Sequence, residues 1–129
     1  MERPHSIHHL DHVQFWTNDL ERAEAFYVML GARVVRRIQL GGKPGIVRME
    51  VGPQQHIDLR YDPEYKTTDR PNVTHINLTL SGTEPEALGS YLRENNVHLL
   101  NDFHTQDGCP TIDTLDPDGN QVELRLLVE

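Results

Sequence analysis

The sequence is poor in several features that would place the protein in a specialised class. Among its 129 residues Cys109 is the only cysteine, so no disulfide can staple the fold, in agreement with a reducing compartment. No apolar run reaches membrane-spanning length, and no hydrophobic segment follows the N-terminus, so we expect neither an anchor nor a signal peptide. Basic residues are scarce: 12 Lys and Arg against 20 Asp and Glu give a net charge of -8, which argues against nucleic acid or a membrane surface as partner. These features predict a cytoplasmic protein.

The rest of the composition is that of an ordinary globular chain. Hydrophobic residues make up 36% and charged residues 25%, and the length predicts one domain with a real core. Eight histidines are more than usual. We expect residues 1–8, with His5 and His8, to form a loosely docked arm, and His98 and His104 to lie at the surface. The remaining histidines fall in regular patterns.

The first half of the chain has the pattern of a strand, a helix and three strands. Polar and apolar residues alternate from 10 to 16, as in a half-buried strand. Asn18 with Glu21 has the form of a capping box, and Gly31 closes the helix that follows. Further strands are expected at residues 33–40, 45–51 and 56–60.

The second half repeats this order after a linker-like stretch at residues 61–72. A strand is predicted at 73–80, a helix capped by Thr83 with Pro85 in its first turn, and a strand at 97–101. The Asp116-Pro117-Asp118-Gly119 turn then joins the last two strands into a hairpin. We therefore predict a single α+β domain with two βαβββ modules, at about 9–61 and 73–127, related by a pseudo-two-fold axis.

Residues able to bind metal occupy equivalent places in the two modules. His12 and His75 lie in the first strands, whereas Asp58 and Glu123 lie in the last, and the spacing from histidine to carboxylate is nearly equal. The apolar face of each strand must pack on the helix of its module, so these four side chains point to the opposite, concave side. If the modules are related by a two-fold axis, two imidazoles and two carboxylates converge there. Such a set suits a divalent metal with positions open for water or substrate, as in catalytic sites.

Other polar residues on the same faces are candidates for binding the substrate. Arg60 and Arg125 are placed to pair with a substrate carboxylate. His56 ranks behind Asp58 as a ligand because its counterpart in the repeat is Gln121. The complete set of substrate-binding candidates is Gln14, Trp16, His56, Arg60, Asn77 and Arg125.

The motifs together resemble the vicinal oxygen chelate superfamily, over residues 9 to 127. They are the opening His-Val-Gln-Phe-Trp, the later Phe26-Tyr27 and Leu30-Gly31, the Thr74-His75-Ile76 segment, and the closing Asp-Pro-Asp-Gly-Asn with Glu123. The resemblance implies that His12, His75 and Glu123 form the metal triad of the catalytic members. Asp58 falls where glyoxalase I has a glutamate ligand, and its shorter side chain leaves three roles open: direct ligand, ligand through water, or general base.

This resemblance implies three classes of function, one of which leads. The expected function is a metal-dependent glyoxalase-like lyase or isomerase that chelates two neighbouring substrate oxygens through Ni, Zn, Co, Mn or Fe(II). Asp58 or Glu123 would shuttle the proton. The alternatives are an Fe(II) extradiol-type dioxygenase and a protein that binds a small drug or toxin without turnover. A homodimer is expected, with the site built either within one chain or across two.

Overall fold

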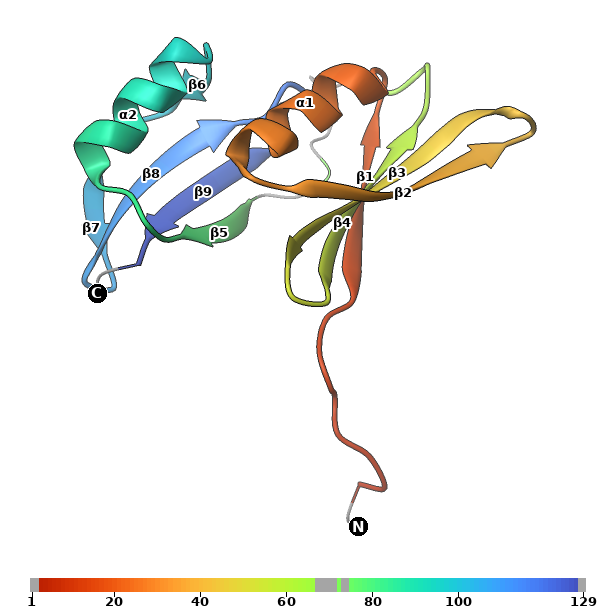
Figure 1. The fold of residues 1–129 in the computed structure, drawn as a ribbon, viewed down its shortest axis with the longest axis horizontal. Helices are drawn as coiled ribbons and strands as arrows, with labels where there is room; N and C mark the ends of the chain where they lie inside the picture. Colours follow the sequence, from red (N-terminus) through yellow and green to blue (C-terminus); the bar gives the residue numbers. More distant parts are fainter. Residues whose placement is uncertain (1–2, 67–71, 73–74, 128–129) are drawn as a thin grey trace. The chain divides into compact units, whose positions relative to one another are not determined.

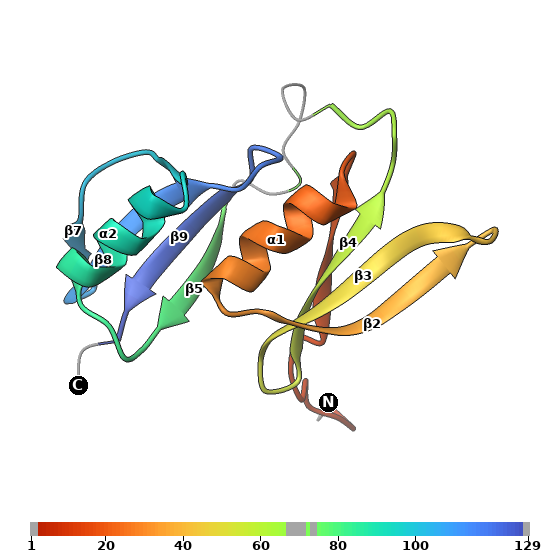
Figure 2. The same cartoon turned by 45° about the horizontal axis from the view of Figure 1, so that its top comes forward.

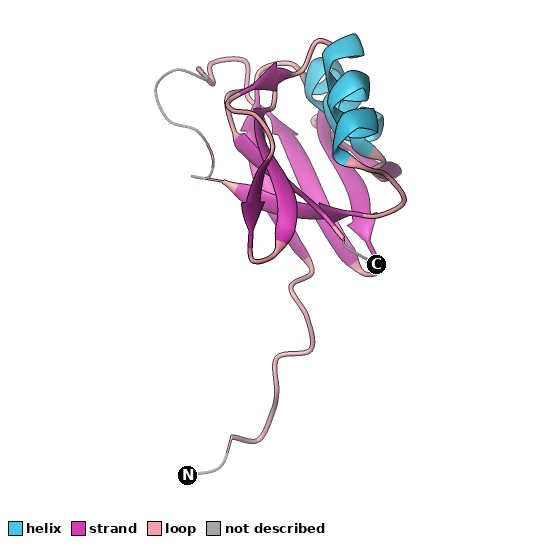
Figure 3. Cartoon of the chain, turned by 90° about the vertical axis from the view of Figure 1, so that its left-hand side faces the viewer, coloured by secondary structure: helices cyan, strands magenta, loops and turns pink. Residues whose placement is uncertain are grey.

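The computed structural model describes residues 3–66, 72 and 75–127. The chain divides into two compact units, residues 1–65 and 66–129, and the division falls inside the predicted linker. In the described part of the chain, neither helix has the length and apolarity needed to cross a membrane. Residues 3–11 form an exposed loop that leads into the first strand (Figure 3).

The first unit contains four strands and one helix, α1 (Figure 1). In chain order they are β1 (His12–Thr17), α1 (Leu20–Leu30), β2 (Arg33–Leu40), β3 (Lys43–Gly52) and β4 (Gln55–Tyr61). The sheet order is β1-β4-β3-β2, in which β1 runs parallel to β4 and the other pairs are antiparallel.

The second unit repeats this topology with one additional short strand. Its elements are β5 (Ile76–Leu80), α2 (Pro85–Glu94), β6 (His98–Leu99), β7 (His104–Gln106), β8 (Cys109–Leu115) and β9 (Gln121–Leu126). The sheet order is β5-β9-β8-β6, with β5 parallel to β9, as Figure 2 shows for β5, β9 and β8. The predicted α+β class with a repeated strand-helix-strand order is confirmed. The sequence did not predict β7, which pairs with β8.

Alternation along the strands determines which side chains form the core of each unit, as predicted. In the first unit the ring of Phe15 lies 6.4 Å from that of Tyr27 of α1, centroid to centroid. Buried apolar residues of the first unit are Phe15, Ala23, Phe26, Tyr27, Val47, Met49, Ile57 and Leu59. Those of the second unit are Leu88, Leu92, Ile112, Val122, Leu124 and Leu126. The polar positions of the same strands therefore face the other side of each sheet.

Both helices begin one residue later than the sequence indicated. Asp19, not Asn18, caps α1, because its carboxylate accepts a hydrogen bond from the backbone N–H of Arg22 at 3.1 Å. The cap residue of α2 is Glu84, not Thr83, and its side chain makes no capping hydrogen bond. Pro85 takes the first helical position, where its missing N–H costs nothing. At the other end of α1, Gly31 adopts φ +117°, the left-handed cap that was predicted.

Two predicted strands are shorter than expected. The strand expected at 97–101 contains only His98–Leu99, because the side-chain oxygen of Asn101 accepts from the backbone N–H of Asp113 at 3.0 Å in place of a ladder bond. The strand expected at 73–80 begins at Ile76, and residues 73 and 74 lie outside the described residues.

The closing hairpin forms at the predicted turn. The Oδ1 atom of Asp116 accepts from the backbone N–H groups of Asp118, at 2.9 Å, and Asn120, at 2.8 Å. Its Oδ2 atom accepts from the side-chain amide of Asn120 at 2.9 Å. Asp116 thus closes the turn and sets the register that brings Glu123 onto β9 opposite β8.

Candidate functional site

The strand register places Asp58 of the first unit and Glu123 of the second at equivalent positions of their sheets. In the first unit Asp58 pairs with Gln14 of the parallel neighbour, and His12 pairs with His56. In the second unit Glu123 pairs with Asn77 of its parallel neighbour. His75 directly precedes β5 and is exposed. Each unit therefore contributes one histidine and one carboxylate to the predicted set of four.

His12 is held by a carboxylate that the sequence analysis did not single out. Its Nδ1 atom lies 2.8 Å from Oδ2 of Asp11. Donation from Nδ1 leaves the lone pair on Nε2, the form that binds metal, and a carboxylate behind a ligating imidazole is the usual partner in metal sites. Nε2 lies 3.8 Å from Oδ2 of Asp58. The sequence contains one indication of this contact, because Asp11 directly precedes His12.

Asp58 is engaged by a side chain from the neighbouring strand. Arg48 of β3 donates from Nε to Oδ1 of Asp58 at 2.7 Å and from Nη2 to Oδ2 at 2.9 Å. The Asp58 side chain is only 6% exposed, and its hydrogen bond raises the pKa of the Arg48 guanidinium. Arg48 engages one lone pair on each oxygen and neutralises the charge of Asp58, and a ligand role for Asp58 stays a prediction. The sequence predicted the strand that carries Arg48 and the polar face on which it lies. It did not predict that Arg48 would pair with Asp58.

The same cluster holds Asp11 in its charged form. The hydrogen bond from His12 is the largest cause that lowers the pKa of Asp11, and the nearby charges of Arg48 and His56 act in the same direction. The ring of His56 also contacts Asp11, since its Nδ1 lies 3.0 Å from the backbone oxygen. His56 is thus engaged in supporting the segment before β1.

In the second unit Glu123 is buried with a neutral partner. Its Oε1 atom accepts a hydrogen bond from the side-chain amide of Asn77 at 2.7 Å, and the residue is 9% exposed. Directly opposite on β8 lies Asp113, which is 8% exposed. The sequence analysis missed Asp113, although it shares the alternation of the hairpin.

The candidates for substrate binding occupy the outer parts of the same faces. The guanidinium of Arg60 lies 5.4 Å from the ring centre of Trp16, its partner in the β1–β4 register, and Trp16 is 40% exposed. Arg125 contacts Asp107 through Nη2 at 3.3 Å, while its Nε is buried without a hydrogen-bond partner among the described residues. Gln14 is exposed on β1. A flat cation over an aromatic ring suits an anionic or planar ligand.

Within either unit, the described residues contain no group of three or more His, Cys, Asp or Glu side chains able to hold a metal ion. The predicted ligands are divided two and two between the units, so no single unit carries the whole set. The donor chemistry nevertheless fits a divalent ion, since it comprises an imidazole oriented by Asp11 and a buried carboxylate whose partner is only an amide.

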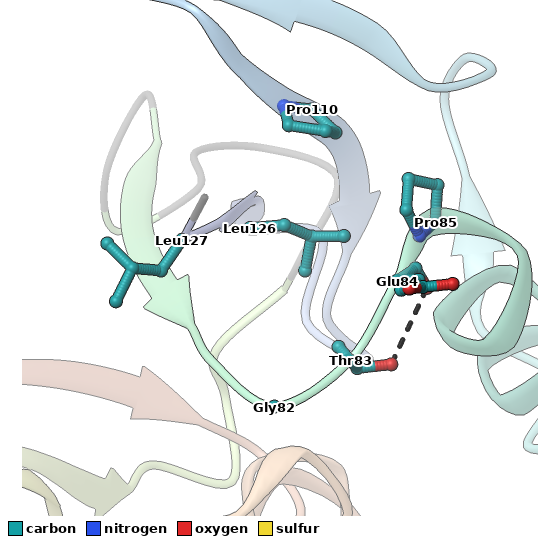
Figure 4. A pocket seen from close by; sticks show the side chains of 7 residues that line it. All are labelled: Gly82, Thr83, Glu84, Pro85, Pro110, Leu126 and Leu127. Atoms are coloured by element: carbon teal, nitrogen blue, oxygen red, sulfur yellow. Dashed lines mark hydrogen bonds between the residues drawn. The ribbon is translucent and has the colours of Figure 1, made fainter. Parts of the chain in front are cut away.

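The second unit also has a pocket that the sequence did not predict. It measures about 440 Å³ and is lined by residues before and at the start of α2 together with the end of β9 (Figure 4). None of the predicted site residues lines it; the lining residues are Gly82, Thr83, Glu84, Pro85, Pro110, Leu126 and Leu127. The hydroxyl of Thr83 lies 3.5 Å from the backbone oxygen of Glu84 at its edge.

Solved structures with similar folds carry several functional names. The glyoxalase/dioxygenase from Nostoc punctiforme is 16% identical, with a TM-score of 0.77, and the match covers 100% of this chain and 97% of that one. Lactoylglutathione lyase from Agrobacterium tumefaciens is 20% identical, with a TM-score of 0.67 and coverages of 94% and 95%. TnmS3, an antibiotic binding protein from Streptomyces sp. CB03234, is 20% identical, with a TM-score of 0.71 and coverages of 96% and 99%. At these identities the likeness shows the fold alone.

The comparison of sequences identifies the family. Curated proteins give no match. Residues 9–124 match the family model described as the glyoxalase/bleomycin resistance protein/dioxygenase superfamily, which confirms the resemblance inferred from the motifs. The matched stretch includes both strand-helix-strand repeats and all four predicted metal ligands. The chain therefore belongs to the glyoxalase/bleomycin resistance protein/dioxygenase superfamily.

Proposed function

We propose that the protein is a metal-dependent, glyoxalase-like lyase or isomerase whose divalent ion is held by His12, His75 and Glu123. The observation that carries this proposal is the contact between His12 Nδ1 and Asp11 at 2.8 Å, which leaves Nε2 able to bind metal. Glu123 adds a buried carboxylate whose partner is an amide rather than a cation. The bound ion would supply Lewis-acid polarisation of two neighbouring substrate oxygens.

Glu123 is the better candidate for moving the substrate proton. Both oxygens of Asp58 accept hydrogen bonds from Arg48, and the guanidinium neutralises the charge of this carboxylate. Glu123 has one oxygen oriented by Asn77, which leaves the other to accept and return a proton. Asp58 would then act by holding Arg48 beside His12, and Arg60 on Trp16 would bind an anionic group of the substrate.

The state of Asp58 also favours a second candidate, an Fe(II) extradiol-type dioxygenase. If Arg48 keeps Asp58 out of the ligand set, two histidines and one carboxylate remain, the combination typical of non-haem Fe(II) oxygenases. Consumption of O2 with catechols by the Fe(II)-loaded protein would favour this candidate over the lyase or isomerase.

Metal analysis of the purified full chain is the test. The protein is stripped with chelator and then titrated separately with Ni, Zn, Co, Mn and Fe(II). We expect about one ion per chain, and we expect His75→Ala to abolish stoichiometric binding. His98→Ala, which removes another exposed histidine of the same unit, should bind as the wild type does. Full occupancy in His75→Ala would overturn the ligand assignment.

If the wild-type chain binds no metal under any condition, the enzyme proposal fails. A binding protein without turnover, as the name of TnmS3 describes for that protein, would then be the best remaining candidate. We also propose a homodimer, which sedimentation analysis at micromolar concentration would test. A monomer with full metal occupancy would show that the site needs one chain only.

A further inference from the structure

The sheet of the first unit has one face that packs on α1. Two contacts identify it: the ring of Phe15 lies beside that of Tyr27 of α1, and the guanidinium of Arg37 pairs with Glu24 of α1. The strand register joins Phe15 to Arg37 in one row across the sheet, through Leu59 and Val47. Because successive residues of a strand point to opposite faces, the next row lies on the face away from α1.

That next row forms an apolar floor on the open face of the first unit. The register pairs Trp16 with Arg60, Arg60 with Ile46, and Ile46 with Ile38. Trp16 is 40% exposed, and the other three residues are half-buried. An aromatic ring and two branched aliphatic side chains are thus partly open on one face, as in surfaces that bind small molecules.

Arg60 places a positive charge without an acidic partner in this floor. Its guanidinium lies 5.4 Å from the ring centre of Trp16, and among the described residues it makes no ion pair or hydrogen bond. The equivalent arginine of the second unit, Arg125, contacts Asp107 at 3.3 Å and has the register partners Thr79 and Thr111. The first unit therefore sets an uncompensated cation among apolar groups, whereas the second unit surrounds its arginine with polar ones.

A second arginine on the open face also lacks an acidic partner within the described ranges. Arg36 of β2 lies two residues before Ile38, so the two share a face, and Arg36 is exposed. Its register partner is Arg48, whose charge is already neutralised by Asp58. In a chain of net charge -8, this face keeps two uncompensated positive charges, which attract an anion.

The size and chemistry of the floor indicate a class of ligand. Neighbouring strands lie about 4.8 Å apart, so the row from Trp16 over Arg60 to Ile46 spans about 10 Å. This length accommodates one aromatic ring with one carboxylate. A flat ring stacks on an indole or a guanidinium, and a guanidinium also binds a carboxylate through two parallel hydrogen bonds.

We propose that the open face of the first unit binds a planar aromatic carboxylate, with its ring on Trp16 and Ile46 and its carboxylate on Arg60. This inference rests on the anion-binding role proposed above for Arg60 and extends it to a class of substrate. Arg36 adds attraction for the anion at longer range. Binding through these residues needs no metal, because none of them belongs to the proposed set of metal ligands.

The test uses the chelator-stripped full-length chain and three small probes. Benzoate is planar and anionic, cyclohexanecarboxylate is anionic but not planar, and benzamide is planar but neutral. Trp16 is the only tryptophan, so its indole N–H gives a single signal in a proton–nitrogen NMR correlation spectrum. We expect benzoate to shift this signal saturably. Benzoate should bind at least about 5-fold more tightly than either other probe, because each of them lacks one of the two interactions.

Variants assign the binding to Arg60. Arg60→Gln should weaken the binding of benzoate about 10-fold or more and leave that of benzamide unchanged, a difference that a general loss of structure would not produce. Arg36→Gln should weaken benzoate only about twofold, as expected for a charge about 10 Å away in water. Arg37→Gln changes the neighbouring residue, which faces α1, and should bind benzoate as the wild type does.

Three results would each overturn the inference: no saturable shift with benzoate, equal affinity for the three probes, or unchanged benzoate affinity in Arg60→Gln. The comparison of probes uses the wild-type chain, so it decides the matter even where a variant does not fold. Metal binding without benzoate binding overturns the inference and leaves the proposed metal site standing. Benzoate binding by a chain that binds no metal supports the inference and overturns the metal-dependent enzyme.

Discussion

Arg48 donates two hydrogen bonds to Asp58, of 2.7 and 2.9 Å, across the β3–β4 ladder. The equivalent carboxylate of the second unit, Glu123, has Asp113 in the place of that arginine. The two halves of the repeat therefore share topology but differ in charge at one position. In the first unit the carboxylate is therefore paired with an arginine, whereas in the second unit it lies opposite another acid.

Removing Arg48 should destabilise the first unit strongly. Arg48→Met leaves the carboxylate of Asp58 buried without a cation, and loss of one partner of a buried pair costs about 3–5 kcal/mol. Arg37→Met breaks an ion pair with Glu24 in which the arginine is 62% exposed, and should destabilise the protein far less. Urea unfolding measures both. An equal decrease in the free energy of unfolding in the two variants would show that the buried Arg48–Asp58 pair stabilises the protein no more than the exposed Arg37–Glu24 pair.

Metal should stabilise the folded chain through Glu123. The free energy of unfolding of stripped protein should rise by about 2.7 kcal/mol when the preferred ion is added at 100 times its Kd. Glu123→Gln keeps a side-chain oxygen for Asn77 and should fold, but its melting temperature should not respond to the ion. Thermal melts with and without metal make the comparison. A full metal-induced shift in Glu123→Gln would remove this residue from the ligand set.

Asp116 should be the most sensitive position of the closing turn. Asp116 is 4% exposed, and its carboxylate accepts hydrogen bonds from two backbone N–H groups and one side-chain amide. Asp116→Ala leaves those donors without an acceptor and should cost about 2–3 kcal/mol, measured by urea unfolding. Asp62→Ala removes a single exposed turn contact, to the N–H of Glu64, and should cost about 0.5–1 kcal/mol. A larger loss of stability in Asp62→Ala than in Asp116→Ala would contradict the role of Asp116 in closing the hairpin.

The end of α1 depends on the backbone conformation of Gly31. At φ +117° a side chain is strained even though no atom lies within 4 Å of the added Cβ. Gly31→Ala should therefore destabilise the protein by about 1 kcal/mol. Gly31→Asn should cost less, because Asn tolerates left-handed conformations better. Thermal unfolding of the two variants tests the order, which a purely steric effect of side-chain size would invert.

Much of the fold could be predicted from local pattern. Alternation placed Phe15, Ile57 and Val122 on the buried faces, and the turn chemistry around Asp116 located the closing hairpin. Helix starts were less accurate, because Asn18 and Asp19 are both good caps and only the folded geometry selects one. The short β7 lacked a periodic signal, since three residues are too few to show alternation.

The candidate site divides in the same way between local and long-range information. Repetition along the chain identified the four candidate ligands His12, Asp58, His75 and Glu123, because equivalent strands carry equivalent residues at similar spacing. The partners of the carboxylates could not be predicted, because they depend on which residues oppose each other across a ladder. Register placed Arg48 beside Asp58 and Asp113 beside Glu123.

The sequence by itself determined the family, the repeated strand-helix-strand order and the polar face on which the candidate ligands lie. These properties follow from periodicity and from turn residues. Both are local features of the sequence, so they can be recognised without knowing the tertiary contacts. Only the tertiary structure decided that Asp58 is bound by Arg48 while Glu123 faces a second acid. The charge around a side chain depends on neighbours brought together across strands, and the residue at one position of the register decides whether a carboxylate faces an arginine or another acid.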